Sequence, residues 1–406
     1  MRRLFCLAAA AALLSGILAA PTARAAREDT VRIGVLTDFS SVYQDNTGRG
    51  SLAAAEMAVD DYVAAHPKSA LKLEVVSADH QHKPDIGLST ARRWFDQEGV
   101  EAIVDLTNSA IALGVSALAA EKNRVAIVSS SGTTRLTGDS CNANTLHWGF
   151  DNYGISSATA KATVTSGGKE WFFITADYAF GHDLEKQTSE IVEANGGKIL
   201  GTVRHPLGTQ DFASFLLQAQ GSGAQVVAFA NGGGDFINVL KQSVEFGVPS
   251  SQTVVGMYVE VNDLNAVGLD VAQGLRFSQS FYWDLNDATR AWAARFIERH
   301  DKYPTSNHAA AYSGVLHFLK AREAAKTGDG KKIVAQMKAM PTDDEVYGKG
   351  SVRVDGRKLH PMYLFQVKTP AESKGPWDFA KVIAEVPADE AWRSLAEGGC
   401  ALAAAE

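Results

Sequence analysis

Short apolar runs alternate with apolar positions at helical spacing along the first third of the chain. The run at 31–36 predicts a buried strand, and the apolar spacing within 52–63 predicts the helix that follows it. The same alternation predicts further strands at 71–77, 102–104 and 125–128, and helices at 86–96 and 110–122. Repeats of this kind build a parallel sheet that helices cover on both faces.

A second series with the same rhythm begins after Asp151, although the two series share no direct sequence repeat. It predicts strands at 171–174, 198–203, 226–229 and 253–255, and helices near 183–195, 212–220 and 236–246. From Arg276 the pattern changes to a strand pair, helices at 288–300, 309–325 and 331–340, and a hairpin of 351–354 with 361–367 around Asp355-Gly356. Two such α/β units predict two sheets that face a cleft. Ligand-binding loops should lie beyond the carboxyl ends of the strands.

The first 25 residues have the features of a cleaved secretory signal. Arg2 and Arg3 precede an apolar run that ends near Ala20, and the small-residue triplet 23–25 offers a cleavage site. No later segment has the length of a transmembrane span. We therefore expect residues 1–25 to be removed and the product to be soluble in the periplasm.

The chain is acidic, and 406 residues favour two domains over one. Cleavage would remove three arginines and no acid, so the formal charge would move from −7 to −10. This charge argues against nucleic acid and anionic membrane as partners.

Only Cys141 and Cys400 would remain after cleavage, because Cys6 lies in the signal. An even number of cysteines in an oxidising compartment predicts one disulfide, which would tie the C-terminus to the middle of the chain.

Sequence signatures of catalysis are absent. The chain has no G-x-S-x-G elbow, no phosphate loop and no dinucleotide fingerprint. Gly232-Gly233-Gly234 fits a tight strand-to-helix turn better than a cofactor loop. His80-x-His82 lacks a third ligand nearby, which favours a solvated loop over a metal site. We therefore expect no cofactor, no metal and no enzymatic activity.

The opening motif 33–43, with the segment 48–61 that follows it, resembles the leucine/isoleucine/valine-binding protein family. The likeness extends over nearly all of the mature chain and includes 177–181, 211–212, 272–274 and, in a sub-branch of the family, 282–287. The resemblance implies a type I periplasmic-binding fold, with two doubly wound parallel-sheet lobes joined by three hinge crossings. It also implies a monomer that binds a small molecule and docks on the inner-membrane permease of an ABC importer.

The family fold implies how the lobes divide the chain. The crossings should lie near 150–154, 278–283 and 344–350. Lobe one should take 31–150 and 281–343, and lobe two should take 151–280 and 345–383. The tail 384–406 should return to lobe one, where Cys400 could meet Cys141.

Family members hold a ligand carboxylate in lobe one with hydroxyls and with backbone N–H groups at helix starts. The positions of this chain that match are Ser109, Ser131, Thr133 and Thr134. A plain helix cap would also explain Ser109, and turn formation would explain the other three.

Aromatic residues should cover the apolar part of the ligand. The resemblance assigns this role to Tyr43, Tyr178 and Phe180, and it gives weaker contact positions at Asn231, Tyr258 and His308, the last of which would also fit a solvent-facing helix N-terminus.

The chain departs from the amino-acid binders at one position. Those proteins need an acid in lobe two for the α-ammonium group, because an unpaired buried charge is costly. Met257 or Tyr258 falls where this acid should be, and Glu260, Asp263 and Asp177 are the possible substitutes. Loss of the acid favours an aromatic or other apolar carboxylate, while a branched-chain amino acid stays an alternative.

The sequence therefore predicts capture of a small carboxylate by lobe closure, for delivery to a transporter. A ligand sensor that acts on a receptor would share the fold and differ only in its partner. An exported hydrolase would need a base beside the serines at 129–131, and no histidine is evident there.

Overall fold

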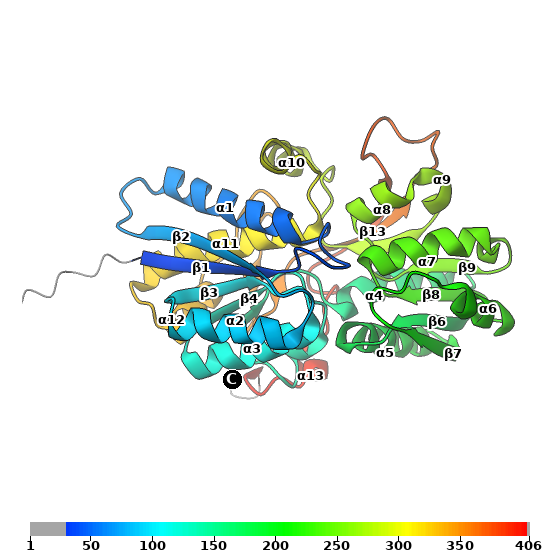
Figure 1. Ribbon diagram of the computed structural model, residues 1–406, viewed down its shortest axis with the longest axis horizontal. Helices are drawn as coiled ribbons and strands as arrows, with labels where there is room; N and C mark the ends of the chain where they lie inside the picture. Colours follow the sequence, from blue (N-terminus) through cyan, green and yellow to red (C-terminus); the bar gives the residue numbers. More distant parts are fainter. Residues whose placement is uncertain (1–29, 404–406) are drawn as a thin grey trace, which may run out of the picture.

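The computed structural model describes residues 30–403, which form two α/β lobes that lie side by side (Figure 1). The predicted signal, residues 1–25, lies outside the described residues. No helix within 30–403 is long and apolar enough to cross a membrane.

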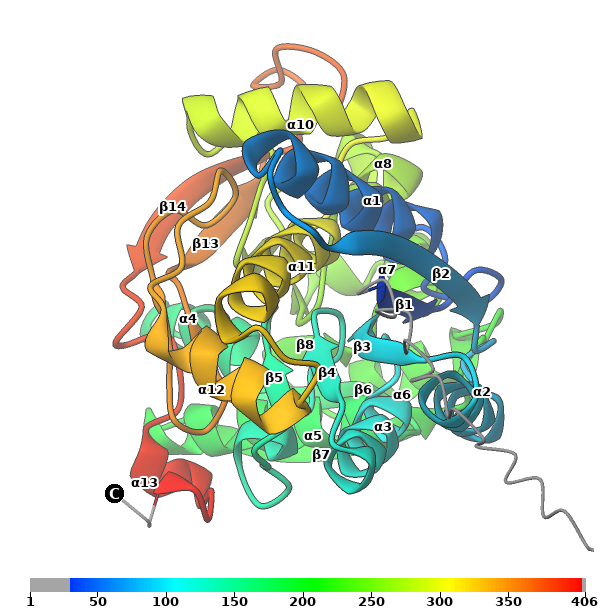
Figure 2. The ribbon, with the colours of Figure 1, turned by 90° about the vertical axis from the view of Figure 1, so that its left-hand side faces the viewer.

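The first lobe contains a five-stranded parallel sheet in the order β2-β1-β3-β4-β5. Its strands are β1 (Thr30–Thr37), β2 (Lys72–Asp79), β3 (Val100–Asp105), β4 (Val125–Val128) and β5 (Thr145–His147). Apolar residues on one face pack against α1 (Gly48–Ala65), α11 (Ser306–Ala325) and α12 (Gly330–Ala339). The other face packs against α2 (Pro84–Asp96) and α3 (Ser109–Lys122), while α10 (Asp287–His300) lies outside α1 (Figure 2). Burial on both faces explains why β4 and the middle of β3, residues 102–104, are apolar.

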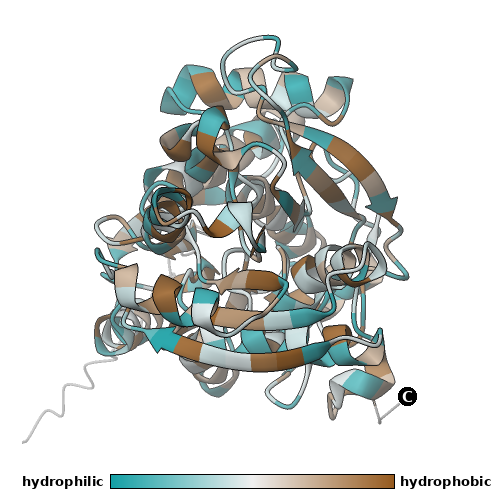
Figure 3. Cartoon of the chain, turned by 90° about the vertical axis from the view of Figure 1, so that its right-hand side faces the viewer, coloured by the Kyte–Doolittle hydropathy of each residue, from teal (hydrophilic) through white to brown (hydrophobic). Residues whose placement is uncertain are grey.

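The second lobe contains a four-stranded parallel sheet in the order β7-β6-β8-β9. Its strands are β6 (Glu170–Ala176), β7 (Lys198–His205), β8 (Val226–Ala230) and β9 (Thr253–Gly256). One face packs against α4 (Asn152–Thr165) and α5 (Ala179–Ala194), and the other against α6 (Ala213–Gly221) and α7 (Gly233–Glu245). The short helices α8 (Val261–Val267) and α9 (Leu269–Ala272) follow β9. Figure 3 views the molecule from this end and shows strands rich in hydrophobic residues. These two sheets confirm the predicted α/β fold class.

The hairpin expected near Asp355-Gly356 forms, but its second strand was predicted wrongly. Gly356 has a φ of +89°, so the chain reverses at once and β11 (Ser351–Val352) pairs with β12 (Lys358–Leu359). The apolar run predicted at 361–367 instead forms β13 (Met362–Val367), which lies between β10 (Arg276–Gln279) and β14 (Ala380–Val386) in an antiparallel sheet. A tight turn pairs the residues next to it, so β13 does not take part in the hairpin. It pairs instead with β10 and β14, which are more distant in the sequence.

The packing of 344–360 bears on where the third crossing lies. Val346 and Val352 are buried in the core of the first lobe, and Arg357 forms a parallel bridge with His147 in β5. Met362 packs with residues of the second lobe. We therefore propose a third crossing at about 359–361, later than the range expected from the sequence.

The C-terminal tail contacts both lobes. Trp392 packs in the second lobe, where its indole N–H donates to the carbonyl of His360 at 2.9 Å. Arg393 then donates to the carbonyl of Thr134 at 3.0 Å in the first lobe. Cys400 forms a disulfide with Cys141, as the cysteine count predicts. The chain after α13 (Leu395–Gly398) is therefore fixed covalently to the first lobe.

Candidate ligand-binding site between the two sheets

The carboxyl ends of the strands in the two parallel sheets face each other across the junction of the lobes. Hydrogen bonds join the loops on either side. The backbone N–H of Gly234 donates to the carbonyl of Val42 at 2.9 Å, and the Asn46 amide donates to the Asp263 carboxyl at 3.0 Å. Gly233, between β8 and α7, has a φ of +56°, so the glycine run is a strand-to-helix turn, as predicted. The lobes are therefore in a closed arrangement.

Two serine hydroxyls from adjacent strand ends meet at the start of α3. The hydroxyl of Ser131, after β4, donates to that of Ser109 at 3.1 Å, and both side chains are buried. Asn108, and not Ser109, caps the helix, because its side-chain oxygen accepts from the N–H groups of Ala110 and Ile111 at 2.8 and 3.1 Å. The Ser109 hydroxyl is thus not needed as a cap. A hydroxyl pair at a helix N-terminus suits a carboxylate.

The threonines of the second loop are buried as well. Thr134 donates through its N–H and its hydroxyl to the two carboxyl oxygens of Asp183, each at 2.9 Å. Asp183 belongs to α5, so this contact joins the lobes and occupies the donors of Thr134 in the closed arrangement. Thr133 precedes the short helical turn Thr134–Thr137. Sequence reasoning did not find Asp183, which lies on a different lobe from its partner.

Four of the predicted aromatic residues meet between the lobes. The hydroxyls of Tyr43 and Tyr178 are 2.9 Å apart, and the ring centroids of Tyr43 and Tyr258 are separated by 6.3 Å. Phe180 lies 5.7 Å from Tyr258, and Phe150, which sequence reasoning missed, stacks on Tyr258 at 4.7 Å. Burial raises the pKa of Tyr43 and Tyr258 well above the ordinary value, so both remain neutral donors. Phe150 lies three residues after β5, a short strand that the apolar pattern did not predict, so no strand end pointed to this residue. These five residues are called the aromatic cluster below.

His82 also contacts the aromatic cluster, contrary to its interpretation as part of a solvated loop. Only 8% of the residue is exposed, and its ring lies 5.3 Å from those of Tyr43 and Tyr178. His80 is fully buried beside it. The loop is buried because it follows β2 at the lobe junction, which its polar composition does not reveal. Among residues 30–403, no group of three or more metal-ligating side chains is positioned for a metal ion.

Asn231 and His308 have protein partners of their own. The Asn231 amide donates to the ring of His205 at 3.1 Å, whereas its side-chain oxygen has no partner among the described residues. His308 is fully buried and does not face solvent. It accepts from the N–H of Thr305 and contacts the carbonyl of Thr47, both at 3.1 Å, and burial lowers its pKa to about 3. His308 therefore holds α11 against α1.

The three acids named as substitute partners for an ammonium group differ in their surroundings. Asp177 is exposed and pairs with His182 at 2.8 Å. Glu260 is buried and accepts from the N–H and hydroxyl of Ser306 at the start of α11. Asp263 accepts from the Asn46 amide and from the N–H of Glu260. Burial raises the pKa of Glu260 to about 8 and that of Asp263 to about 7. Both carboxyls are therefore committed to contacts that hold the lobes together.

Asp235, in the first turn of α7, was not found by sequence reasoning. Its Oδ2 accepts from the N–H of Gly208 at 3.2 Å, and its Oδ1 has no partner among the described residues. Burial raises the pKa of this carboxyl to about 7. Asp235 is thus a buried acid with an unused oxygen on the second lobe.

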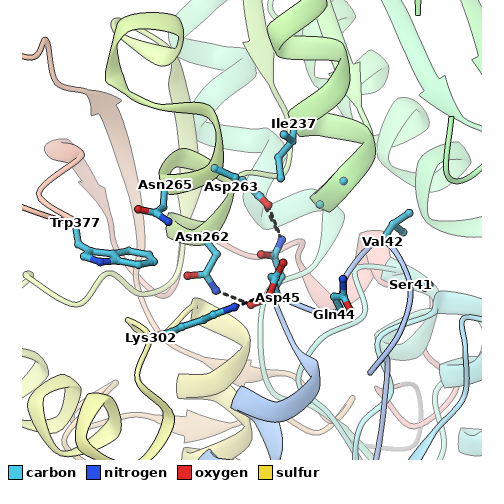
Figure 4. A pocket seen from close by; sticks show the side chains of 14 residues that line it. Ser41, Val42, Gln44, Asp45, Ile237, Asn262, Asp263, Asn265, Lys302 and Trp377 are labelled. Carbon is cyan, nitrogen blue, oxygen red and sulfur yellow. Dashed lines mark hydrogen bonds and ion pairs between the residues drawn. The ribbon is translucent and has the colours of Figure 1, made fainter. Parts of the chain in front are cut away.

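A polar hollow of about 230 Å³ lies beside the aromatic cluster, between loops of both lobes (Figure 4). Asp45 and Lys302, which form an ion pair at 2.8 Å, line it from the first lobe, and Asn262 and Trp377 line it from the second. An added Cβ at Gly233, which also lines the hollow, would lie 3.0 Å from the Tyr43 ring. The hollow therefore adjoins the wall formed by Tyr43.

The serines at 129–131 show no arrangement of a nucleophile with a base. His147 is the histidine that reaches this segment, and its Nε2 contacts the carbonyl of Ser131 at 2.7 Å and not a hydroxyl. Burial lowers the pKa of His147 well below the ordinary value. The geometry therefore gives no support to the hydrolase alternative.

Stability should fall between pH 5 and pH 8, and Glu260 should account for part of this change. The folded state keeps the Glu260 proton up to about pH 8, whereas the unfolded chain loses it near pH 4.5. The stabilisation is complete below pH 4.5 and is lost as the pH rises through 8. In urea denaturation across this range, Glu260→Gln should remove on the order of 2 kcal/mol of the change. The exposed control Glu190→Gln should leave the slope unchanged, and equal slopes in all three proteins would contradict this assignment.

A family model described as periplasmic binding protein matches residues 30–376. Leu/Ile/Val-binding protein homolog 6 from Brucella melitensis biotype 1 is 25% identical over 354 residues, which are 83% of this chain and 87% of the relative. The crystal structure of a periplasmic binding protein from Burkholderia mallei is 46% identical, with a TM-score of 0.89, and covers 92% of this chain and 99% of its own. A branched chain amino acid ABC transporter periplasmic ligand-binding protein from Burkholderia xenovorans LB400 is 40% identical, with a TM-score of 0.81 and the same coverage.

More distant solute binding proteins of ABC transporters from R. palustris share the fold. One, in complex with 4-hydroxybenzoate, is 22% identical with a TM-score of 0.79 over 90% of this chain and 99% of its own. Another, in complex with benzoate, is 18% identical with a TM-score of 0.79, and the match covers 92% of this chain and 99% of its own. The matches confirm the type I fold and the resemblance found in the sequence. The family consists of periplasmic substrate-binding proteins and not of enzymes. With its model matched over 30–376, this chain belongs to the periplasmic binding protein family.

Proposed function

We propose that this protein captures a small aromatic carboxylate between its lobes and delivers it to the inner-membrane permease of an ABC importer. The observation that carries the proposal is the pairing of the Ser109 and Ser131 hydroxyls, at the start of α3, with the aromatic cluster. The hydroxyls and the helix N-terminus suit a carboxylate, and the rings suit a flat apolar body. The benzoate and 4-hydroxybenzoate complexes of the R. palustris proteins support the same ligand class.

The surroundings of the acids favour a ligand without an amine. Glu260 and Asp263 hold the two lobes together, and their raised pKa values disfavour the negative charge that an ammonium group needs. Tyr258, a neutral hydroxyl bound by the Asn307 amide at 2.8 Å, stands beside them. An α-ammonium at this place would be buried without a charged partner, which is costly.

A branched-chain amino acid is the second candidate ligand, and Asp235 is the observation that favours it. Its unpaired oxygen is the kind of group that accepts from an ammonium. The Burkholderia xenovorans protein and the Brucella relative carry names that refer to branched-chain amino acids. In this alternative, Asp235→Asn would abolish binding of leucine, isoleucine and valine.

Closure supplies the mechanism of capture. A ligand held by both lobes binds the closed arrangement more tightly than the open one, and it therefore shifts the population toward closure. The contacts of Asn46 with Asp263 and of Thr134 with Asp183 then add to the stability of the closed form. The permease would bind surfaces on both lobes whose relative position is set by closure. A receptor in place of the permease would use the same closure, and a binding assay with the purified permease separates these partners.

The test is a thermal-shift and calorimetric panel of benzoate, leucine, isoleucine and valine. A benzoate concentration of about a hundred times Kd should stabilise the protein by about 2.7 kcal/mol, whereas the amino acids should have no effect. Ser109→Ala should weaken benzoate binding by about tenfold, because a hydrogen bond to the charged carboxylate is lost. Ser189→Ala, which alters a helix-surface serine of α5, should leave the affinity unchanged. Stabilisation by the amino acids alone would reject the proposal.

A further inference from the structure

The loop that carries His82 is held in a costly backbone conformation. Gln81 and His82 have φ values of +50° and +57°, a region that side-chain-bearing residues seldom adopt. The Nδ1 of His80 accepts from the N–H of His82 at 3.0 Å, and the N–H of Lys83 donates to the carbonyl of His80 at 2.8 Å. Such conformations persist where surrounding contacts impose them, and they concentrate at ligand sites. The backbone at His82 is therefore held in place by contacts within its own loop.

The His82 ring has unused hydrogen-bonding capacity in a buried place. Neither ring nitrogen has a hydrogen-bond partner among residues 30–403, although most buried polar groups are paired. Burial lowers the pKa of His82 to about 4, so the ring is neutral at pH 7 and offers one N–H donor and one acceptor. A hydroxyl group also has one donor and can accept, so it can form a hydrogen bond with either nitrogen of this ring.

The paired hydroxyls of Tyr43 and Tyr178 lie beside this ring. They come from different lobes and are 2.9 Å apart, and each ring is 5.3 Å from that of His82. When one hydroxyl donates to the other, the second keeps its own hydrogen. The group of His82, Tyr43 and Tyr178 thus has one unused O–H donor on a tyrosine, and one N–H donor and one acceptor nitrogen on the imidazole.

The order of the strands in the first sheet determines how far His82 lies from Ser109 and Ser131, and therefore how a ligand between them would be oriented. Ser131 follows β4, Ser109 follows β3 and His82 follows β2, with β1 between β3 and β2. Neighbouring strands lie about 4.8 Å apart, so His82 is about 10–14 Å along the sheet from the two serines. A ligand whose carboxylate lies at the serines would therefore reach His82 with a polar group on the far side of its ring.

The charges near His82 exclude a second anionic group there. The carboxyl of Asp38 is fully buried with an oxygen 4.0 Å from Nδ1 of His82. It accepts from the N–H groups of Ser41 and Tyr43 at 2.8 and 3.1 Å, which hold it in place. A ligand carboxylate beside Asp38 would be repelled, whereas a neutral hydroxyl would not.

From this geometry we infer that His82, with the Tyr43–Tyr178 hydroxyl pair, forms a subsite for a ring hydroxyl, so that the preferred ligand is a benzoate hydroxylated at a carbon remote from the carboxylate. The inference rests on the proposed function, because it places the carboxylate at Ser109 and Ser131. It adds the residue that distinguishes one aromatic acid from another. A ligand that lacks the hydroxyl would leave His82 unpaired, and the site would bind it more weakly.

The experiment compares benzoate, 3-hydroxybenzoate, 4-hydroxybenzoate and terephthalate by calorimetry on the full mature chain. At least one hydroxybenzoate should bind about tenfold more tightly than benzoate, and terephthalate should bind more weakly than benzoate. His82→Phe keeps a ring between the tyrosines and should reduce the hydroxybenzoate affinity to that of benzoate, with little change for benzoate itself. Tyr178→Phe, a second variant with a different effect on packing, should also reduce the preference. His182→Phe, at an exposed histidine, should leave it unchanged.

The outcomes separate this inference from the proposed function. Equal affinities of the native protein for benzoate and the hydroxybenzoates would overturn the subsite and leave the proposed function in place. Equal losses for both ligands in His82→Phe would assign His82 to packing and would also overturn the subsite. Tighter binding of terephthalate than of benzoate would do the same. Binding of branched-chain amino acids alone would overturn both proposals.

Discussion

Replacing Arg357 with methionine is expected to destabilise the protein by about 3–5 kcal/mol, the loss found when a buried ion pair is broken on one side. Arg357 is fully buried, with Nη1 3.5 Å from the Asp151 carboxyl, and it donates to the carbonyls of Gly149 and Lys358. Its guanidinium also lies 4.0 Å from the ring centroid of Trp392. One side chain therefore joins the segment 149–151, the end of the 351–359 hairpin and the C-terminal tail.

The measurement is guanidinium denaturation of Arg357→Met beside the exposed control Arg92→Met, which should change stability by less than about 0.5 kcal/mol. The Asp151 carboxyl would be left buried without its charged partner, so Asp151→Asn in the same chain should recover part of the loss. The recovery distinguishes a lost ion pair from lost packing. A loss below about 1 kcal/mol would show that Arg357 does not hold these segments together.

The central strands β1, β3, β4, β6 and β8 were predictable because burial on both faces gives each of them a mostly apolar run. The helix α4 was missed, since the residues that it buries include Ser156, Thr159 and Thr163 and give no apolar periodicity. The strand β14 was missed because it is largely exposed, as Val382 and Ile383 at 47% show. Periodicity detects elements with an apolar face, and these two elements have little of it.

The candidate site was predictable only in part, and for a different reason. The resemblance to the family identified Tyr43, Tyr178, Phe180 and Tyr258, which the structure places in contact. The partner of Thr134 and the fixed position of His82 depend on contacts between distant segments, which no local pattern encodes. The ligand-binding roles of all the predicted residues stay predictions, namely those of Tyr43, Ser109, Ser131, Thr133, Thr134, Tyr178, Phe180, Asn231, Tyr258 and His308. The resemblance to the family indicated which residues to consider for ligand binding. The structural roles of some of them, such as the contact of Thr134 with Asp183, became evident only from the contacts in the structure.

Removal of the disulfide is expected to lower the free energy of unfolding by about 3–4 kcal/mol. The bond between Cys141 and Cys400 joins residues 259 positions apart, so its loss lets the unfolded chain gain much of the entropy that the closed loop withheld. The tail that it anchors also carries Trp392 and Arg393, the second of which holds the carbonyl of Thr134 beside the site. The native protein with and without dithiothreitol should differ by the same amount as the native protein and the double variant Cys141→Ser/Cys400→Ser, all measured by guanidinium denaturation. Dithiothreitol should have no effect on the double variant, and a difference below about 0.5 kcal/mol between oxidised and reduced protein would mean that noncovalent contacts alone hold the tail.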